Sequence, residues 1–330
     1  MADNIVVVVE QRDGKLNRVS WETLTAGQAL AASGWALDAA VVGKNVESLA
    51  HEVAGKKLRK VYAIESPSFE PYTPDAFAFG LKQFLQSQTP KLVLMPHTYQ
   101  VRDFVPKLAT AMGRTVISDC IGYKKEGDRL LFTRQMFQGK LAADVSFTGP
   151  PPWFVTFQNG AFRGDKVEAG ASAASVEAVQ IEIGDGVIRE KPQPVFKEAK
   201  QAVDLTQAEI IVSIGRGIKE QQNIQLAQRL AEALGGEIAA SRPICDAGWL
   251  PMDRQIGSSG QTVAPKLYLA LGISGAIQHI VGMKGSRTIV AVNKDSEAPI
   301  LEIADYAVVG NLFDIVPPLI EEVKKAKAGS

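Results

Sequence analysis

Short runs of β-branched and aliphatic residues alternate with longer amphipathic stretches along the first hundred residues. These patterns predict strands at 5–10, 39–43, 60–65 and 91–95, and helices at 26–32, 75–87 and 101–112. Thr73 followed by Pro74 is typical of a helix N-terminus, and Gly113 is typical of a helix end. Strands and helices in this order build a parallel sheet with helices packed on it, so we expect an α/β fold.

The pattern changes after residue 113, where short alternating runs are broken by glycine and proline up to about residue 162. The runs 130–134 and 153–157 are typical of antiparallel strands. We therefore expect antiparallel strands to be added to the first α/β domain. A proline-spaced segment then predicts a connector over 190–204.

The alternation of strands and helices resumes after this connector. It predicts strands at 209–214, 238–240, 288–293 and 306–309, and helices at 223–234 and 317–327. The apolar run that starts at Leu271 turns through Ser274 and Gly275 into a further helix. This order predicts a second parallel sheet in the C-terminal part of the chain.

The 330 residues exceed the roughly 250 that one hydrophobic core usually supports, so we expect two domains, 1–200 and 205–330. Lys+Arg and Asp+Glu both number 36, and this even balance argues against a nucleic-acid-binding surface. The two cysteines, Cys120 and Cys245, form no CxxC pattern, which is typical of a reducing compartment. The three histidines are too few and too scattered for a metal site built on imidazoles.

The first residues match neither a signal peptide nor a transit peptide, because they lead directly into the first predicted strand. No apolar run approaches the ~20 residues that a membrane-spanning helix needs. We therefore expect a soluble, cytoplasmic protein that is not embedded in a membrane.

Several predicted strands of the C-terminal part end in glycines, small hydroxyl residues and arginines. Ligands of open α/β sheets bind beyond the carboxyl ends of the strands, so these loops are candidate binding sites. Three of the loops are 213–217, the pair Ser241 and Arg242, and 257–260. Each loop also has an ordinary interpretation. The first is typical of a tight turn, the second of a capped helix with a surface arginine, and the third of a mobile loop.

The run that ends at His279 is the more specific feature. Ser274 can cap the following helix, and Gly275 lets a phosphate approach the backbone N–H groups. Gln278 and His279 follow within about one helical turn, although a lone histidine on a helix often has a purely structural role. Asn293 ends another strand with an amide that can pair with a nucleotide edge. The pattern predicts a dinucleotide-binding protein but lacks the G-x-G-x-x-G fingerprint of ordinary NAD-binding domains.

The segment 265–279, followed by Lys284, 288–295 and 298–300, resembles the signature of the α subunit of electron transfer flavoprotein. The likeness covers the second lobe, roughly 209–327, and the first lobe agrees with it more loosely. The resemblance implies an N-terminal α/β domain that is nucleotide-binding-like in fold, carries added antiparallel strands and packs on the β subunit. It also implies a C-terminal Rossmann-like parallel-sheet domain that binds FAD.

The resemblance implies a role for each matching position in holding FAD. Arg216 and Ser241 match contacts to the dinucleotide, Arg242 an arginine over the flavin ring, and Ser259 a hydroxyl near flavin N5. The segment 274–279 matches the loop around the pyrophosphate and ribityl chain. The full set of expected FAD contacts is Arg216, Ser241, Arg242, Ile256, Gly257, Ser258, Ser259, Ser274, Gly275, Ala276, Ile277, Gln278, His279, Asn293, Asn311 and Leu312. Ser258 departs from the family's usual glutamine, and Asn311 departs from the common aspartate on the adenosine side.

The function that the resemblance implies is an electron carrier without substrate turnover of its own. Its β partner would bind AMP or a second FAD, dehydrogenases would donate electrons, and a membrane quinone oxidoreductase would accept them. A flavin that has gained one electron is negatively charged near N1 and O2, so His279 as a donor and Arg242 as a cation would favour an anionic semiquinone.

Two other functions fit the residues less well. A non-redox adenine-nucleotide-binding module is the main alternative, because nothing in the first lobe looks catalytic. An NAD-dependent dehydrogenase is disfavoured, because no His/Asp or Tyr/Lys arrangement suited to hydride transfer is visible. In the first lobe we expect His97 to have a structural role and Cys120 to be a packing residue rather than a reactive thiol.

Overall fold

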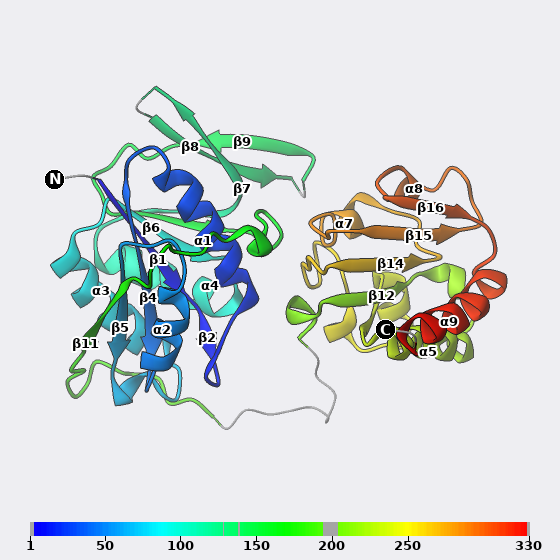
Figure 1. Ribbon diagram of the computed structural model, residues 1–330, viewed down its shortest axis with the longest axis horizontal. Helices are drawn as coiled ribbons and strands as arrows, with labels where there is room; N and C mark the ends of the chain where they lie inside the picture. The colour runs from blue at the N-terminus through cyan, green and yellow to red at the C-terminus, as the bar shows by residue number, and fades with distance from the viewer. Residues whose placement is uncertain (1–2, 128, 138, 194–203, 329–330) are drawn as a thin grey trace. The chain divides into compact units, whose positions relative to one another are not determined.

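The computed structural model describes residues 3–127, 129–137, 139–193 and 204–328, which form two compact units (Figure 1). Nearly all of the first unit precedes residues 194–203, and nearly all of the second unit follows them. Most of the predicted connector 190–204 lies in 194–203, outside the described residues. No helix within the described ranges is both long enough and apolar enough to cross a membrane.

The first unit is built on a nine-stranded sheet with helices on both faces. Its helices are α1 (Arg18–Ala31), α2 (Glu47–Ala54), α3 (Pro74–Gln88) and α4 (Tyr99–Ala111). The sheet strands are β1 (Asn4–Val9), β4 (Ala36–Gly43), β5 (Lys60–Glu65), β6 (Leu92–Pro96), β7 (Val116–Glu126), β8 (Arg129–Met136), β9 (Leu141–Val145), β10 (Trp153–Phe157) and β11 (Ser175–Gln180). A small separate hairpin pairs β2 (Gln11–Arg12) with β3 (Lys15–Leu16).

The strands of the first sheet follow the order β11-β5-β4-β1-β6-β10-β7-β8-β9. All neighbours from β11 to β7 are parallel, whereas β8 pairs antiparallel with both β7 and β9. The predicted α/β fold with added antiparallel strands is therefore confirmed.

Strand β1 shows why this sheet is buried on both faces. Ile5 and Val7 join the core under α1 and α2, whereas Val6 and Val8 join the core under α3 and α4. Side chains of a strand alternate between the two faces, so a run without polar residues needs helices on both sides. This requirement is met by two helices on each face.

One prediction for the first unit is wrong. The segment 153–157 forms β10, which is parallel to both β6 and β7 rather than antiparallel. Four of its five residues are buried, because β10 lies in the interior of the sheet. A short strand buried on both faces is typical of a parallel sheet.

Helix α1 is longer than the predicted 26–32, because it begins at Arg18 with Asn17 as its cap. The first half of this helix was not predicted because it contains two polar β-branched residues, which interrupt the helical pattern. Thr23 and Thr25 place their hydroxyls on the carbonyls of Val19 and Trp21, four residues earlier, so both are accommodated inside the helix. Helix α2 and strand β11 are further elements that the sequence pattern did not predict.

The second unit is a five-stranded, fully parallel sheet with the strand order β13-β12-β14-β15-β16. Its strands are β12 (Ile210–Ile214), β13 (Glu237–Ala240), β14 (Leu267–Leu271), β15 (Ile289–Asn293) and β16 (Tyr306–Val309). Its helices are α5 (Ile224–Leu234), α6 (Arg242–Asp246), α7 (Ile277–Ile280), α8 (Pro299–Glu302) and α9 (Leu312–Ala328). Counted within this unit, the order is 2-1-3-4-5, a doubly wound sheet whose order reverses between β12 and β14.

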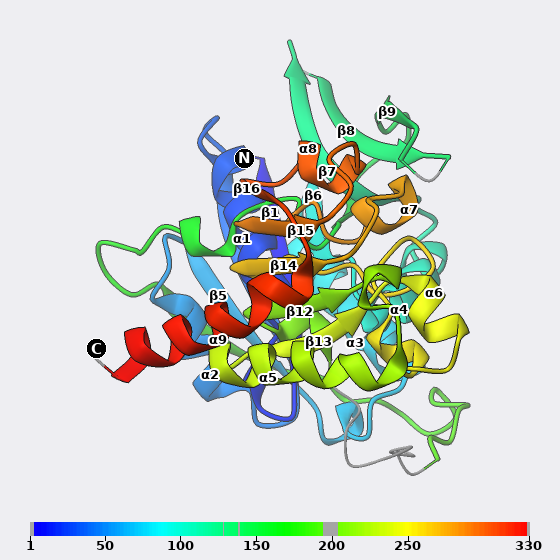
Figure 2. The same cartoon turned by 90° about the vertical axis from the view of Figure 1, so that its right-hand side faces the viewer.

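The two faces of the second sheet are covered differently. Helices α5 and α9 lie side by side and supply Leu230 and Ile320 to the core on one face (Figures 1 and 2). The opposite face, with Tyr268 and Ala270, is covered by the loop segments around α7 and α8, including Met283 and Ile300. The predicted Rossmann-like parallel sheet is confirmed.

Two predicted helix starts differ from the structure. Helix α9 begins at Leu312 rather than Pro317, because the side chain of Asn311 accepts a hydrogen bond from the Phe313 N–H at the helix start. Helix α7 is only four residues long, begins at Ile277 and has no side-chain cap. Ser274 therefore does not cap α7, and Ser274 and Gln278 are not one helical turn apart.

Candidate functional site

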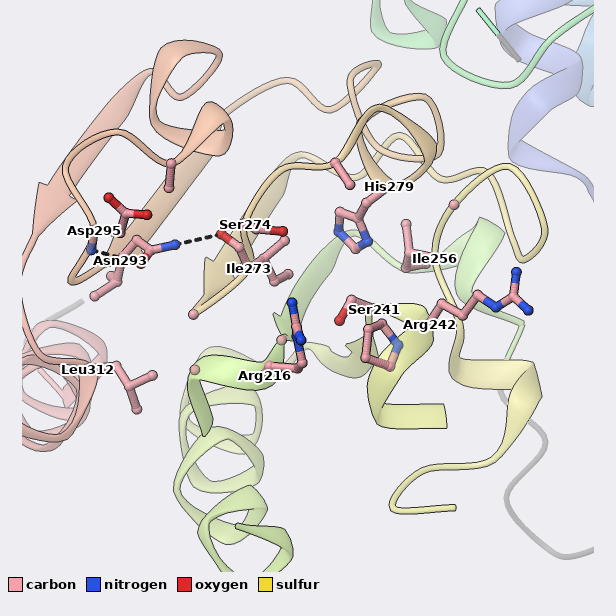
Figure 3. A pocket seen from close by; sticks show the side chains of 18 of the residues that line it. Arg216, Ser241, Arg242, Ile256, Ile273, Ser274, His279, Asn293, Asp295 and Leu312 are labelled. Atoms are coloured by element: carbon pink, nitrogen blue, oxygen red, sulfur yellow. Dashed lines mark hydrogen bonds between the residues drawn. The ribbon is translucent and has the colours of Figure 1, made fainter. Parts of the chain in front are cut away.

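A cavity of about 770 Å³ lies along the carboxyl edge of the second sheet (Figure 3). Its walls come from the loops that follow all five strands. Gly215 follows β12, Ser241 follows β13, Gly272 follows β14, Lys294 follows β15 and Gly310 follows β16. Pockets for small ligands and cofactors are usually about 300–1,000 Å³, and in doubly wound sheets they lie at this edge.

The glycines after β12 and β14 bring two backbones into close contact at the point where the strand order reverses. A Cβ on Gly215 would lie 2.4 Å from the carbonyl oxygen of Gly272, and a Cβ on Gly217 would lie 2.5 Å from the Gly272 Cα. Gly272 itself has a φ of 62°, a left-handed conformation that favours glycine. The Gly217 N–H donates to the Gly272 carbonyl over 3.0 Å, so the contact is also hydrogen-bonded.

Positive charge predominates among the lining side chains. Arg216, Lys219, Arg242 and Lys294 line the cavity together with one carboxylate, Asp295. Arg242 is about two-thirds exposed, and its Nε lies 3.2 Å from Asp246 one helical turn away. An exposed pair of this kind is weak, so the guanidinium is free to turn toward a bound anion. The cavity therefore suits a ligand with negatively charged groups.

His279 lies in this site on α7 and is only 6 % exposed. Its Nε2 is 2.8 Å from the hydroxyl of Tyr268, whereas its Nδ1 is buried and makes no hydrogen bond within the described residues. Burial lowers the pKa of His279 to about 4, and the backbone of Ile256 opposes this lowering only in part. The imidazole is therefore neutral near pH 7.

The loop after Ile256 packs directly on α7. The Ser258 N–H donates to the Gln278 carbonyl over 2.7 Å, and a Cβ on Gly257 would lie 2.8 Å from the same oxygen. Ser259 Oγ accepts a hydrogen bond from the Gln255 side chain over 2.9 Å. These contacts fix the hydroxyl of Ser259 beside the cavity.

The two asparagines of the predicted site are both engaged by their own loops. Asn293 donates to the Ile273 carbonyl over 2.8 Å and accepts from the Asp295 N–H. Asn311 donates to Asp314 and caps α9. Both line the cavity, but their amides hold the loops after β15 and β16 in place in this structure.

The structure brings most of the predicted site residues together around one cavity. Those that line it are Arg216, Ser241, Arg242, Ile256, Gly257, Ser258, Ser259, Ser274, Ala276, Gln278, His279, Asn293, Asn311 and Leu312. Gly275 and Ile277 are not among the lining residues. A Cβ on Gly275 would lie 2.2 Å from the Ile300 backbone nitrogen, so this glycine allows close packing against α8.

Some lining residues were not predicted. Lys219, Lys294 and Asp295 belong to the cavity wall, as do Ile273 and Ala298. Lys294 and Asp295 directly follow β15, so their strand-end position was a usable signal. Lys219 has a φ of 66°, unusual for a residue other than glycine, and the sequence carries no sign of it.

In the first unit, a cavity between the end of β1 and α4 has a volume of only about 10 Å³, room for about one water molecule. It is lined by Glu10, Phe77 and Phe104, among others. His97 Nδ1 lies 2.8 Å from the Thr156 hydroxyl, in agreement with a structural role. Burial raises the pKa of the Cys120 thiol to about 12, which makes it unreactive. Among the described residues, no group of three or more His, Cys, Asp or Glu side chains could hold a metal ion.

A doubly wound sheet with a glycine-lined, cationic cavity at its switch point defines the class: an α/β protein that binds a nucleotide or dinucleotide. Comparisons with known proteins are more specific. A family model described as "Electron transfer flavoprotein FAD-binding domain" matches residues 204–284, and "Electron transfer flavoprotein domain" matches 5–183. The chain belongs to the electron transfer flavoprotein family and is of its α-subunit type.

Two of the most similar curated relatives are named electron transfer flavoprotein subunit alpha. One is from Bacillus subtilis (38 % identical over 325 residues) and one from Thermoanaerobacterium thermosaccharolyticum (38 % over 326 residues), each covering 98 % of both chains. A third, from Anaerotignum propionicum, is named acryloyl-CoA reductase electron transfer subunit beta and is 36 % identical, covering 98 % of this chain and 96 % of the relative. The predicted family is confirmed.

Proposed function

We propose that this chain holds FAD in the cavity of its second unit and carries electrons as the α subunit of a heterodimer. The observation that carries this proposal is the cavity itself, which collects most of the residues expected to contact FAD, from the loops of all five strands. When bound, FAD supplies reversible one- and two-electron chemistry that no side chain of the protein offers.

The residues of the cavity fit FAD in three respects. The close approach of Gly215, Gly217 and Gly272 leaves a backbone-walled hollow at the switch point, where a pyrophosphate can approach. Arg216 and Lys219 follow β12 and can offset the two phosphate charges. The buried, unpaired Nδ1 of His279 would gain a hydrogen-bond partner from a ligand, which would remove the cost of leaving it unpaired.

Each part of the cavity would serve a different part of the ligand. Arg242 would place a permanent positive charge over the flavin ring, and His279 would direct a hydrogen bond at the edge that gains negative charge. Ser259, held by Gln255, would meet flavin N5. Leu312, which is buried at the start of α9, would pack against the adenosine half. Together these groups would stabilise an anionic semiquinone and favour one-electron transfer.

The partners belong to the same proposal. The domain 1–200 would pack on a β subunit that binds AMP or a second FAD, and the domain 205–330 would hold FAD. Dehydrogenases would donate electrons, and a membrane quinone oxidoreductase would accept them, while the complex itself works in the cytoplasm. The α-subunit names of the most similar relatives support the heterodimer.

The experiment is an absorbance spectrum of the chain co-purified with its β partner, followed by stepwise anaerobic reduction with dithionite. One FAD per heterodimer and a red anionic semiquinone during reduction are the expected results. Two flavins per heterodimer would indicate a complex that splits electron pairs between two acceptors. A colourless preparation that releases AMP or ATP on denaturation would overturn the proposal in favour of a non-redox nucleotide-binding module.

A further inference from the structure

Tyr268 lies directly beneath the cavity without lining it. It stands on β14, is fully buried, and faces the side of the sheet that α7 covers. Its hydroxyl is 2.8 Å from His279 Nε2. One ring nitrogen of His279 is therefore engaged on the side of the protein core.

The other ring nitrogen is left for the cavity. Nδ1 of His279 makes no hydrogen bond in the described part of the chain, and the polar neighbour on that side is the backbone of Ile256. Ile256 lines the cavity, whereas Tyr268 does not. In Figure 3 the imidazole of His279 stands next to Ile256 at the cavity wall. The ring thus directs Nε2 toward the core and Nδ1 toward the cavity side.

A neutral imidazole carries its proton on one nitrogen only, and the neighbouring groups decide on which. If the Tyr268 hydroxyl donates to Nε2, the proton of His279 is on Nδ1; in the opposite arrangement Nδ1 is a bare acceptor. In the described part of the chain, the structure shows one hydrogen bond of the buried Tyr268 hydroxyl, the one to His279 Nε2. A buried O–H needs an acceptor, so this geometry favours the first arrangement.

We propose that Tyr268 is a positioning residue that donates to His279 Nε2 and so holds the neutral imidazole as the Nδ1–H tautomer, with a hydrogen-bond donor facing the cavity. The role toward a bound flavin rests on the proposed function, but the tautomer is a property of this chain alone. Because Tyr268 keeps Nε2 engaged, the donor is in place before the ligand gains negative charge, and no proton has to move during reduction.

The first test reads the tautomer directly. The full chain is labelled with ¹⁵N-histidine, and the ring nitrogens are observed by long-range ¹H–¹⁵N NMR near pH 7. The chain has only three histidines, so the variants H51Q and H97Q assign the signals of His279 by elimination. We expect a protonated Nδ1 and an unprotonated Nε2 on His279. A protonated Nε2 in the unmutated chain overturns the proposal without any variant of Tyr268.

The second test removes the tyrosine hydroxyl with Tyr268→Phe. The control is Tyr306→Phe on β16, two strands away from β14, because Tyr306 is 65 % exposed. We expect Tyr268→Phe to shift His279 toward the Nε2–H tautomer and to lower the potential of the first electron, with unchanged FAD content. We expect Tyr306→Phe to change neither. An unchanged tautomer or an unchanged potential in Tyr268→Phe overturns the positioning role. Loss of FAD from the unmutated protein would instead count against the proposed function, since the NMR result does not depend on FAD.

Discussion

His279 and Arg242 line the same cavity in opposite environments. The imidazole is buried and neutral, whereas the guanidinium is largely exposed and permanently charged. A buried donor exerts a strong, directed effect because little water screens it, while an exposed charge acts through a longer-range and weaker field. The two residues should therefore affect a bound flavin in distinguishable ways.

Replacing His279 with alanine should remove the directed donor but leave most of the binding surface. We expect His279→Ala to lower the semiquinone yield by about tenfold, as loss of roughly 1.4 kcal/mol of stabilisation would, with a smaller effect on FAD content. The measurement is stepwise dithionite reduction monitored by absorbance. An unchanged semiquinone yield would contradict the role of His279.

Replacing Arg242 with alanine should lower the flavin potential because it removes a fixed positive charge from the cavity. The free energy of unfolding should change by less than about 0.5 kcal/mol, since the pair with Asp246 is exposed. Arg163→Ala is the matched control, because Arg163 forms a similar exposed pair with Asp165 in the first unit. Potentiometric titration should separate the two variants, and equal potentials would rule out a role for the Arg242 charge.

At the scale of elements, the site depends on how closely the loop after β12 approaches the loop after β14. Gly215 and Gly272 make this approach possible, since a Cβ on Gly215 would meet backbone atoms rather than a movable side chain. Backbone atoms can make room for a Cβ only if the end of β12 moves away from the end of β14.

We expect Gly215→Ala to abolish FAD retention and to lower the free energy of unfolding of the second unit by about 1–3 kcal/mol. Gly184→Ala is the control, because nothing lies within 4 Å of its Cβ position. Flavin content per chain and urea denaturation measure the two effects. Full FAD content in Gly215→Ala would show that the two loops can move apart without loss of FAD binding, and would contradict this prediction.

The sequence predicted best those elements that carry one clear local signal, such as a continuous apolar run or a helix cap. Strand β5 occupies the predicted 60–65, and α3 starts at Pro74 with the Thr73 hydroxyl as its cap. The first half of α1 was hidden because Thr23 and Thr25 satisfy their hydroxyls inside the helix, which no periodicity reveals. The direction of β10 depends on neighbours far away in the chain, so its own five residues could not determine it.

The site was predictable to the extent that strand ends carry glycines, hydroxyls and arginines. The family resemblance added roles for Arg242 and Ser259 that spacing alone does not give. The contact of Tyr268 with His279 was not predicted, because Tyr268 is part of a buried apolar run and reads as a core residue.

At the scale of the whole molecule, each unit holds a buried titratable group with a shifted pKa, and the two groups make stability depend on pH in opposite directions. Burial raises the pKa of Glu22, in the first unit, to about 7, against the weaker effects of the Gly160 N–H and Arg18. Its folded-state pKa exceeds the unfolded value of 4.5, so its contribution to stability is complete below pH 4.5 and is lost as pH rises through 7. The lowered pKa of His279, in the second unit, has the opposite effect: stability present above pH 6.5 is lost as pH falls toward 4.

We expect Glu22→Gln to stabilise the first unit at pH 8 by on the order of 3 kcal/mol and to have little effect at pH 4.5, because glutamine cannot ionise but still accepts from the Gly160 N–H. Glu52→Gln on the exposed face of α2 is the control. Calorimetry across this pH range should show the gain growing with pH in Glu22→Gln alone. A gain that is independent of pH would exclude burial of the carboxylate as its cause.

The cavity takes its walls from loops that extend from Gly215 to Leu312. During synthesis, therefore, the cavity cannot form from the early part of the second unit alone. Its last lining residue becomes available only when the start of α9 has left the ribosome. The first unit, whose sheet is complete by Gln180, can fold well before that moment. On the proposed function, FAD can therefore bind only after the chain has been synthesised at least to Leu312.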